Sequence, residues 1–285
     1  MFRPYSRLPA AALLLSAVVT CGAAQAASGP CPEAAGIVRT VYNNTDKPDA
    51  QGRIRLKEGH AIVTLSDADV GAPFAVACKA WPANPDLLLV AVPLMQDTPD
   101  PENGHVGDLD VLVLDKQTLQ VRQRRRLVGL MSDDAVRIAG LAFDTARYDV
   151  ATDKRAFGIR IEREGASRAN PFDETSLRLF TVHDNELRLV LDGMSVNRSS
   201  GVWDTTCAGE FSESAVSLAI GDTQRRGYRD LIATESHSAS RASMQQGDCK
   251  EKTVKQGKTR HTLTFDGKRY RIPAALRSMD RDSAG

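Results

Sequence analysis

The hydrophobic pattern of this chain is typical of β-strands. Apolar residues alternate with polar ones or run together for a few positions, and polar turn residues separate these runs. We expect three hairpins, at 109–122, 177–191 and 261–272. The third contains Asp266-Gly267 between two alternating runs, which is a strong hairpin signal. Further strands are expected at 61–65, 87–93, 156–162, 215–220 and 230–233.

Helical periodicity is sparse, and only 133–138 has the pattern of a short helix or turn. The expected fold class is therefore all-β, either an irregular β-propeller or packed antiparallel sheets, with few short helices. No repeat of fixed period occurs, which counts against a regular propeller. Polar stretches predict loops at 43–52, 93–107 and 236–258.

The N-terminus has the three features of a secretory signal. Arg3 and Arg7 precede an apolar stretch at 8–19, and the small-x-small sequence of a cleavage site follows at 24–26. We therefore expect a signal peptide at 1–26 and a periplasmic or secreted protein. No other stretch is apolar enough to span a bilayer, so no transmembrane span is expected.

Five cysteines support export. Cleavage of the leader would remove Cys21 and leave four, an even number that favours two disulfides in an oxidising compartment. Four cysteines allow three pairings, and we expect Cys31–Cys78 and Cys207–Cys249 because nearby segments meet more readily. In an alternative form, Cys21 is a lipid-carrying first residue. No cysteine spacing fits a metal site, and no cofactor is expected.

Size and charge restrict the remaining possibilities. The predicted organisation is a single β-rich domain at 27–277 followed by a flexible polar tail at 278–285. Loss of the leader would change the formal net charge from +1 to −1, since Arg3 and Arg7 are its only charged residues. A nearly neutral chain has no general attraction to nucleic acid or to an anionic membrane.

The segment 222–232 reads Asp-Thr-Gln-Arg-Arg-Gly-Tyr-Arg-Asp-Leu-Ile. It resembles the loop-and-strand signature of FG-GAP or VCBS-type propeller repeats, in which the loop wraps calcium. Asp222, Gly227 and Asp230 match that signature, whereas Arg226 stands where an oxygen ligand would be needed. We hypothesise that Arg226 replaces the cation between the two carboxylates. The chain as a whole resembles exported proteins of Gram-negative bacteria, which implies no particular activity.

Catalytic motifs are missing from the sequence. It contains no metal-binding histidine spacing, no G-x-S-x-G and no phosphate-binding glycine loop. Acid pairs occur at Asp108/Asp110 and Asp133/Asp134, and the first pair would share one face of a strand. We therefore name no catalytic residue and expect a protein that is not an enzyme.

The most distinctive chemistry is basic. Arginines crowd the return strand of the first hairpin, and more basic residues surround Tyr270. Such side chains fit an anionic partner, either an envelope protein or an anionic glycan, although basic residues on edge strands also prevent aggregation. The candidate binding residues are Arg122, Arg124, Arg125, Arg126, Lys268, Arg269 and Arg271.

Together these patterns predict an exported, non-enzymatic binding, inhibitor or immunity-type protein on a β scaffold held by disulfides. One alternative is an exported hydrolase that uses dispersed carboxylates, for example on glycans. Another is a structural or assembly protein of the cell envelope. Nucleic acid is not an expected partner.

Overall fold

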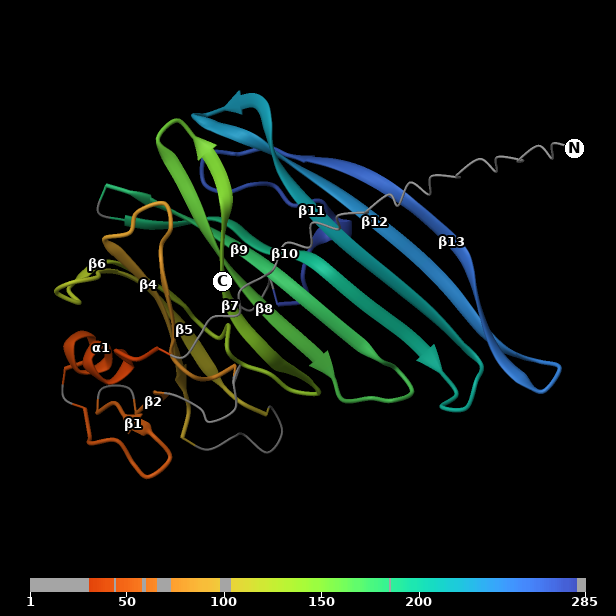
Figure 1. Ribbon diagram of the computed structural model, residues 1–285, viewed down its shortest axis with the longest axis horizontal. Coiled ribbons are helices and arrows are strands. Elements are labelled where there is room, and N and C mark those ends of the chain that lie inside the picture. Colours follow the sequence, from red (N-terminus) through yellow and green to blue (C-terminus); the bar gives the residue numbers. More distant parts are fainter. Residues whose placement is uncertain are drawn as a thin grey trace, which may run out of the picture.

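The described part of the chain forms two antiparallel β-sheets and one short α-helix (Figure 1). The computed structural model describes residues 31–43, 45–57, 60–65, 73–97, 104–184 and 186–280. The predicted all-β class is therefore confirmed, and packed antiparallel sheets are the architecture observed. Within the described ranges, no helix is long and apolar enough to cross a membrane.

The first sheet has the order β1-β2-β4-β5-β6, with β3 paired to β4, and the second is a meander from β7 to β13. The helix is α1 (Ala34–Val41). The strands of the first sheet are β1 (Arg53–Arg55), β2 (Ile62–Thr64), β3 (Ala77–Ala80), β4 (Leu87–Met95), β5 (Gly107–Asp115) and β6 (Val121–Leu127). Those of the second are β7 (Val136–Ala151), β8 (Lys154–Gly165), β9 (Phe172–His183), β10 (Glu186–Trp203), β11 (Gly209–Arg225), β12 (Tyr228–Gln245) and β13 (Asp248–Leu263).

The first sheet is covered on both faces, which explains the continuous apolar runs of β4 and β5. One face, which includes Val111, packs against Phe157 and Phe180 of the second sheet. The other face, which includes Leu112, packs against Ile37 of α1. Neighbouring residues of β5 therefore point into two different cores.

The second sheet divides along its length. β10 pairs with β9 from Glu186 to Ser200, but with β11 only over Asn197–Trp203. Three register irregularities between Leu189 and Asn197 bend β10 away from β11. Beyond the division, β11–β13 stack on the β7–β10 part of the sheet, and Met194 and Leu231 share the core between the two layers.

The C-terminal segment follows the edge that β11 leaves open. The amide of Tyr270 donates to the carbonyl of Val190, and that of Ser278 donates to Gly193. The predicted flexible tail at 278–285 is therefore wrong at its start. Ser278 and Asp280 are buried, because the carboxylate of Asp280 binds the buried Arg178. Residues 281–285 lie outside the described residues, as does the expected leader at 1–26.

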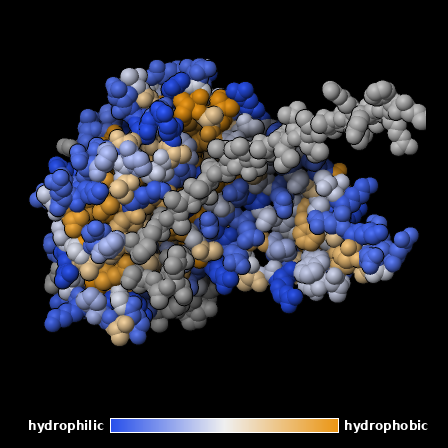
Figure 2. Space-filling model, viewed as in Figure 1, coloured by the Kyte–Doolittle hydropathy of each residue, from blue (hydrophilic) through white to orange (hydrophobic). Residues whose placement is uncertain are grey.

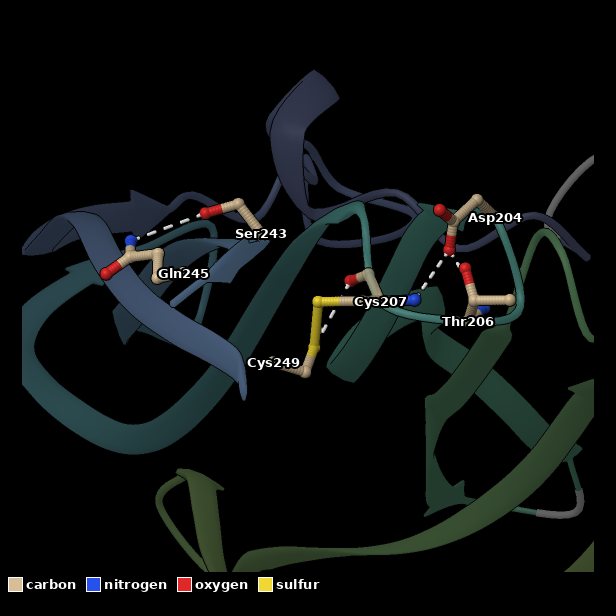
Figure 3. The surroundings of a disulfide bond; sticks show 6 residues. All are labelled: Asp204, Thr206, Cys207, Ser243, Gln245 and Cys249. Atoms are coloured by element: carbon tan, nitrogen blue, oxygen red, sulfur yellow. Dashed lines mark hydrogen bonds between the residues drawn. A yellow bond between two sulfur atoms is a disulfide. The ribbon is translucent and has the colours of Figure 1, made fainter. Parts of the chain in front are cut away.

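At the opposite end, β10–β13 continue beyond the two-layered part as a single sheet, to the lower right in Figure 1. A disulfide between Cys207, in the β10–β11 turn, and Cys249 of β13 holds this extension together (Figure 3). Asp204 supports the same turn by accepting hydrogen bonds from the amides of Thr206 and Cys207. The second disulfide joins Cys31 and Cys78, so both expected pairings are confirmed.

Several local predictions need correction. The expected loop at 236–258 belongs to the long hairpin β12–β13, and the expected helix or turn at 133–138 leads into β7. The third hairpin is only a tight turn, in which Phe265 bridges Tyr270. The first two hairpins are confirmed as β5–β6 and β9–β10.

Candidate functional site

The arginines predicted from the sequence lie on β6, where alternation divides them between two faces. Arg124 is opposite Leu112 and Arg126 is opposite Asp110, so these two arginines share the face covered by α1. Arg125 is opposite Val111 and therefore points to the other face. Only alternate members of the expected basic cluster thus act together.

Asp110 lies beneath Arg124 and Arg126 and is fully buried. Its carboxylate accepts hydrogen bonds from Arg126 Nε at 3.2 Å and from Arg124 Nη2. Tyr42 Oη donates to the same carboxylate at 2.6 Å. Burial alone would raise the pKa of Asp110, but the hydrogen bonds from these three side chains hold it below its usual range. Asp110 therefore stays ionised and fixes the orientation of both guanidinium groups.

Tyr42 directly follows the end of α1. Arg124 lies over its ring, 5.1 Å from the ring centre, which is a cation–π distance. Burial, together with the adjacent charge of Asp110, raises the pKa of Tyr42 well above its usual range. The phenol is therefore a permanent hydrogen-bond donor, and the aromatic ring holds Arg124 from a second side.

A cavity of about 550 Å³ opens beside this cluster. Arg124 and Arg126 form its charged wall, and their side chains are 39% and 44% exposed, so both guanidiniums present unused N–H groups. The acidic Asp108 also lines the cavity, 4.0 Å from Arg126. The remaining walls are mainly apolar, with the polar Asn43 and Gln96, and come from Val41, Asn43, Leu56, Ala61, Leu94, Met95, Gln96, Val106 and Gly107. We call this cavity the arginine pocket. It combines oriented cationic donors with an apolar wall.

The other predicted basic residues are engaged elsewhere. Arg122 pairs with Asp115 at 2.7 Å, and Arg269 pairs with the buried Asp192 at 3.2 Å. Arg271 lies 3.9 Å from Asp266 in the same turn as Lys268. Within the described part of the chain, no hydrogen bond or ion pair joins this turn to the arginines of β6.

The propeller-like segment forms the end of β11, the turn at Arg226-Gly227 and the start of β12. The arginine that binds Asp230 is Arg225, at 3.1 Å, whereas Asp222 is exposed and lies 3.6 Å from Arg229. The hypothesis that Arg226 bridges the two carboxylates is therefore wrong. Arg226 occupies the turn itself, and its side chain extends toward Gly267.

The acid pairs also have structural partners. Asp133 accepts hydrogen bonds from the ring of His105 at 2.8 Å and from the amide of Ile138 at 2.9 Å. Asp108 accepts one from the amide of Gly129. Among the described residues, the one group of potential metal ligands is Cys31, Glu33 and Cys78, but its two sulfurs form a disulfide.

Sequence reasoning found Arg124 and Arg126 but missed Tyr42 as their partner. Tyr42 and Asp110 are separated by 68 positions in the chain, and no local pattern links them. The strand alternation of Arg122, Arg124 and Arg126 was a usable signal, because residues two apart on a strand share a face.

The fold and the pocket define an all-β protein with an oriented pair of arginines in a cavity that also has apolar walls. Comparison with protein-family models, curated proteins and solved structures gave no match.

Proposed function

We propose that this protein is an exported, non-enzymatic binding protein that recognises an amphipathic anion in the arginine pocket. The observation that supports this function is the buried carboxylate of Asp110, which holds two partly exposed guanidiniums in fixed positions. Side chains held in place in advance lose little conformational freedom on binding, so more of the interaction energy appears as affinity.

The chemistry of the walls narrows the ligand class. Guanidinium groups match the geometry of carboxylate, sulfate or phosphate oxygens. A hydrocarbon or aromatic portion of the same ligand would lie against Leu56, Ala61 and Val106. The formal charges of Asp108 and Asp110 balance those of the two arginines, so binding relies on the direction of the exposed N–H groups rather than on net charge.

Export is part of the proposal, and its support comes from the leader-like N-terminus and from two disulfides. The environment of Asp110 does not support the alternative that the protein is a hydrolase. Both of its carboxylate oxygens accept hydrogen bonds from protein side chains, and the residue is fully buried. A substrate would have to displace Arg124 and Arg126 to reach it.

Calorimetric titration with octanoate, using octanamide as the uncharged analogue, tests the proposal. We expect octanoate to bind and octanamide to bind at least about tenfold more weakly, because a hydrogen bond to a charged group contributes about 1.5–3 kcal/mol. Arg124→Gln should weaken octanoate binding by a similar factor. Arg137→Gln is the matched control, since Arg137 is on β7 and forms an exposed ion pair with Glu164 of β8.

A second variant tests the pocket independently, in case Arg124→Gln does not fold. Ala61→Trp fills the apolar side of the pocket and leaves both arginines with Asp110. It should abolish octanoate binding while circular dichroism and the unfolding midpoint stay close to those of the unchanged protein. Absence of octanoate binding at about 1 mM, or equal binding by Arg124→Gln and Arg137→Gln, would contradict the proposed function.

A further inference from the structure

A second concave site, separate from the arginine pocket, lies where the single-layered extension begins. A trough of about 840 Å³ crosses five strands, from β9 to β13. Strand register defines two of its rows, because directly opposed residues share a face. One row is Asp173, Ser199, Glu213, Ser238 and Gln256, and the next is Thr175, Asn197, Ala215, Ser236 and Lys258.

The side chains of these rows are short and mostly uncharged. Hydroxyls and amides predominate, and the few charges include both signs. Ser199 donates to Asp173 at 3.1 Å. Asn197, Ser236 and Gln256 make no side-chain hydrogen bond to another described residue. The trough therefore offers open donors and acceptors, and its two rows hold two acidic side chains, Asp173 and Glu213, and one basic side chain, Lys258.

An aromatic ring lies beside the trough, on the middle one of its five strands. Phe211 occupies the next row along the same face, opposite Gly201. A methyl group placed on Gly201 would come within 2.5 Å of the Phe211 ring, and one on Gly209 within 2.8 Å. The ring therefore lies flat on the backbone at these two glycines, and its other face points away from the sheet. Phe211 is only partly buried, so part of its side chain is open to solvent.

The composition of this surface distinguishes between possible occupants. A protein partner would need apolar side chains at the centre of its interface, and the two rows supply only Ala215. A polyanion would need a cationic lining, but Asp173 and Glu213 oppose Lys258. On the face that Figure 2 shows, the extension is also mostly hydrophilic.

We propose that the trough binds a neutral oligosaccharide, with one sugar ring stacked on Phe211 and the others hydrogen-bonded to the hydroxyl and amide rows. The apolar C–H face of a pyranose ring matches the flat face of a phenyl ring. Its hydroxyls match groups that both donate and accept, such as serine hydroxyls and side-chain amides. Five strands at about 4.8 Å spacing span roughly 19 Å, which suits several linked sugars rather than one.

The extension is suited to hold such a site in shape. The disulfide between Cys207 and Cys249 ties the β10–β11 turn to β13, at the end beyond Phe211 (Figure 3). A ladder of backbone hydrogen bonds joins all five strands beneath the trough. A rigid floor keeps the two rows aligned, and aligned groups lose less entropy when a long ligand binds.

Titration of the full chain with cellohexaose, maltohexaose and chitohexaose tests this site, followed by calorimetry or by ligand-observed NMR. We expect one of these neutral probes to bind. Phe211→Leu, which still covers the glycines but removes the flat ring, should weaken that binding by at least about tenfold. Ser238→Trp, which fills the middle of the trough, should abolish it.

Ser212→Ala is the matched control, because Ser212 is on β11 next to Phe211 but points to the opposite face. It should bind the oligosaccharide as the unchanged protein does. Octanoate binding in the arginine pocket should be unaffected by Phe211→Leu, so the two proposals fail or succeed separately. The oligosaccharide site is refuted if no probe binds at about 1 mM, or if Phe211→Leu and Ser238→Trp bind as well as Ser212→Ala.

Discussion

Replacement of Asp280 by asparagine tests whether the C-terminal segment is held by a buried ion pair. Asp280 accepts hydrogen bonds from Arg178 at 3.1 Å and 3.2 Å, from Ser176 at 2.9 Å and from Ser278 at 2.6 Å. Arg163 approaches the same carboxylate at 3.4 Å. Asparagine keeps the shape of this side chain but leaves the two buried arginines with one negative charge fewer.

The size of the effect follows from the pKa of Asp280. Burial alone would raise it, but the charge of Arg178 and the hydrogen bonds from Arg178 and Ser278 lower it from 3.8 to about 2. That difference corresponds to about 2–3 kcal/mol of folding free energy at neutral pH. Breaking a fully buried ion pair costs about 3–5 kcal/mol. Because Arg178 keeps Asp192 as a second partner, we expect a loss of about 2–4 kcal/mol.

The dependence on pH has a definite sign. A carboxylate with a lowered pKa stabilises the folded state above its ordinary pKa, and this contribution disappears as the pH falls toward the lowered value. The difference between the unchanged protein and Asp280→Asn should therefore be constant near pH 7 and shrink between about pH 4 and pH 2.

Urea unfolding followed by circular dichroism at several pH values measures this difference. Asp222→Asn is the control, because that side chain is fully exposed, and it should change the free energy of unfolding by less than about 0.5 kcal/mol. If Asp280→Asn is as stable as this control near pH 7, or if its deficit persists unchanged at the lowest pH, the ion-pair explanation is wrong.

Three further outcomes can be checked with similar methods. Tyr42→Phe should cost about 1.5–3 kcal/mol in urea unfolding, since it removes a hydrogen bond to a buried charge. This loss should shrink above about pH 10, where the unfolded chain releases the phenol proton and the folded protein keeps it. Replacing Cys207 and Cys249 together by serine should cost up to about 4 kcal/mol on the chain-entropy model, and a negligible loss would show that the bridge constrains little. Lys252→Thr combined with Lys255→Thr on the edge strand β13 should increase light scattering from self-association, and unchanged scattering would show that these lysines do not protect the edge.

The parts of the fold that sequence patterns predict are those in which one or both strand faces are buried. In β5, Val111 and Leu112 point into two cores, so an uninterrupted apolar run marks the strand. In β9 and β10, apolar residues enclose a short polar turn and define a hairpin. The disulfide pairings also followed from spacing, because each bridge joins segments that the chain brings back within one sheet or beside it.

The sequence pattern did not predict the long hairpin β12–β13, and the reason is physical. Over Ser236–Gln245 only Ala242 is buried, so neither face requires a row of apolar side chains and the alternation disappears. The same holds for the lysine-rich first half of β13. A strand of this kind is specified by its neighbours and by the bridge at Cys249, which a local reading of the sequence does not capture.

Contacts between segments that are distant in the chain are the second feature that the sequence alone does not predict. Asp110 marks a strand in the sequence, but its role depends on Tyr42 and on two arginines across a hairpin. The division of the second sheet depends on register irregularities in β10 that no sequence motif predicts.

Among the described residues, no hydrophobic cluster extends under the far part of β11–β13, and this connects the failure of prediction with the proposed oligosaccharide site. A sheet without a second described layer can keep serines, amides and a flat phenylalanine on its surface, because none of them has to match an opposing layer. The same sheet must then gain its rigidity from backbone pairing and from the Cys207–Cys249 bridge. Polar strands that continue past a packed core, closed at their far end by a disulfide, are therefore consistent with a binding surface for a polar ligand.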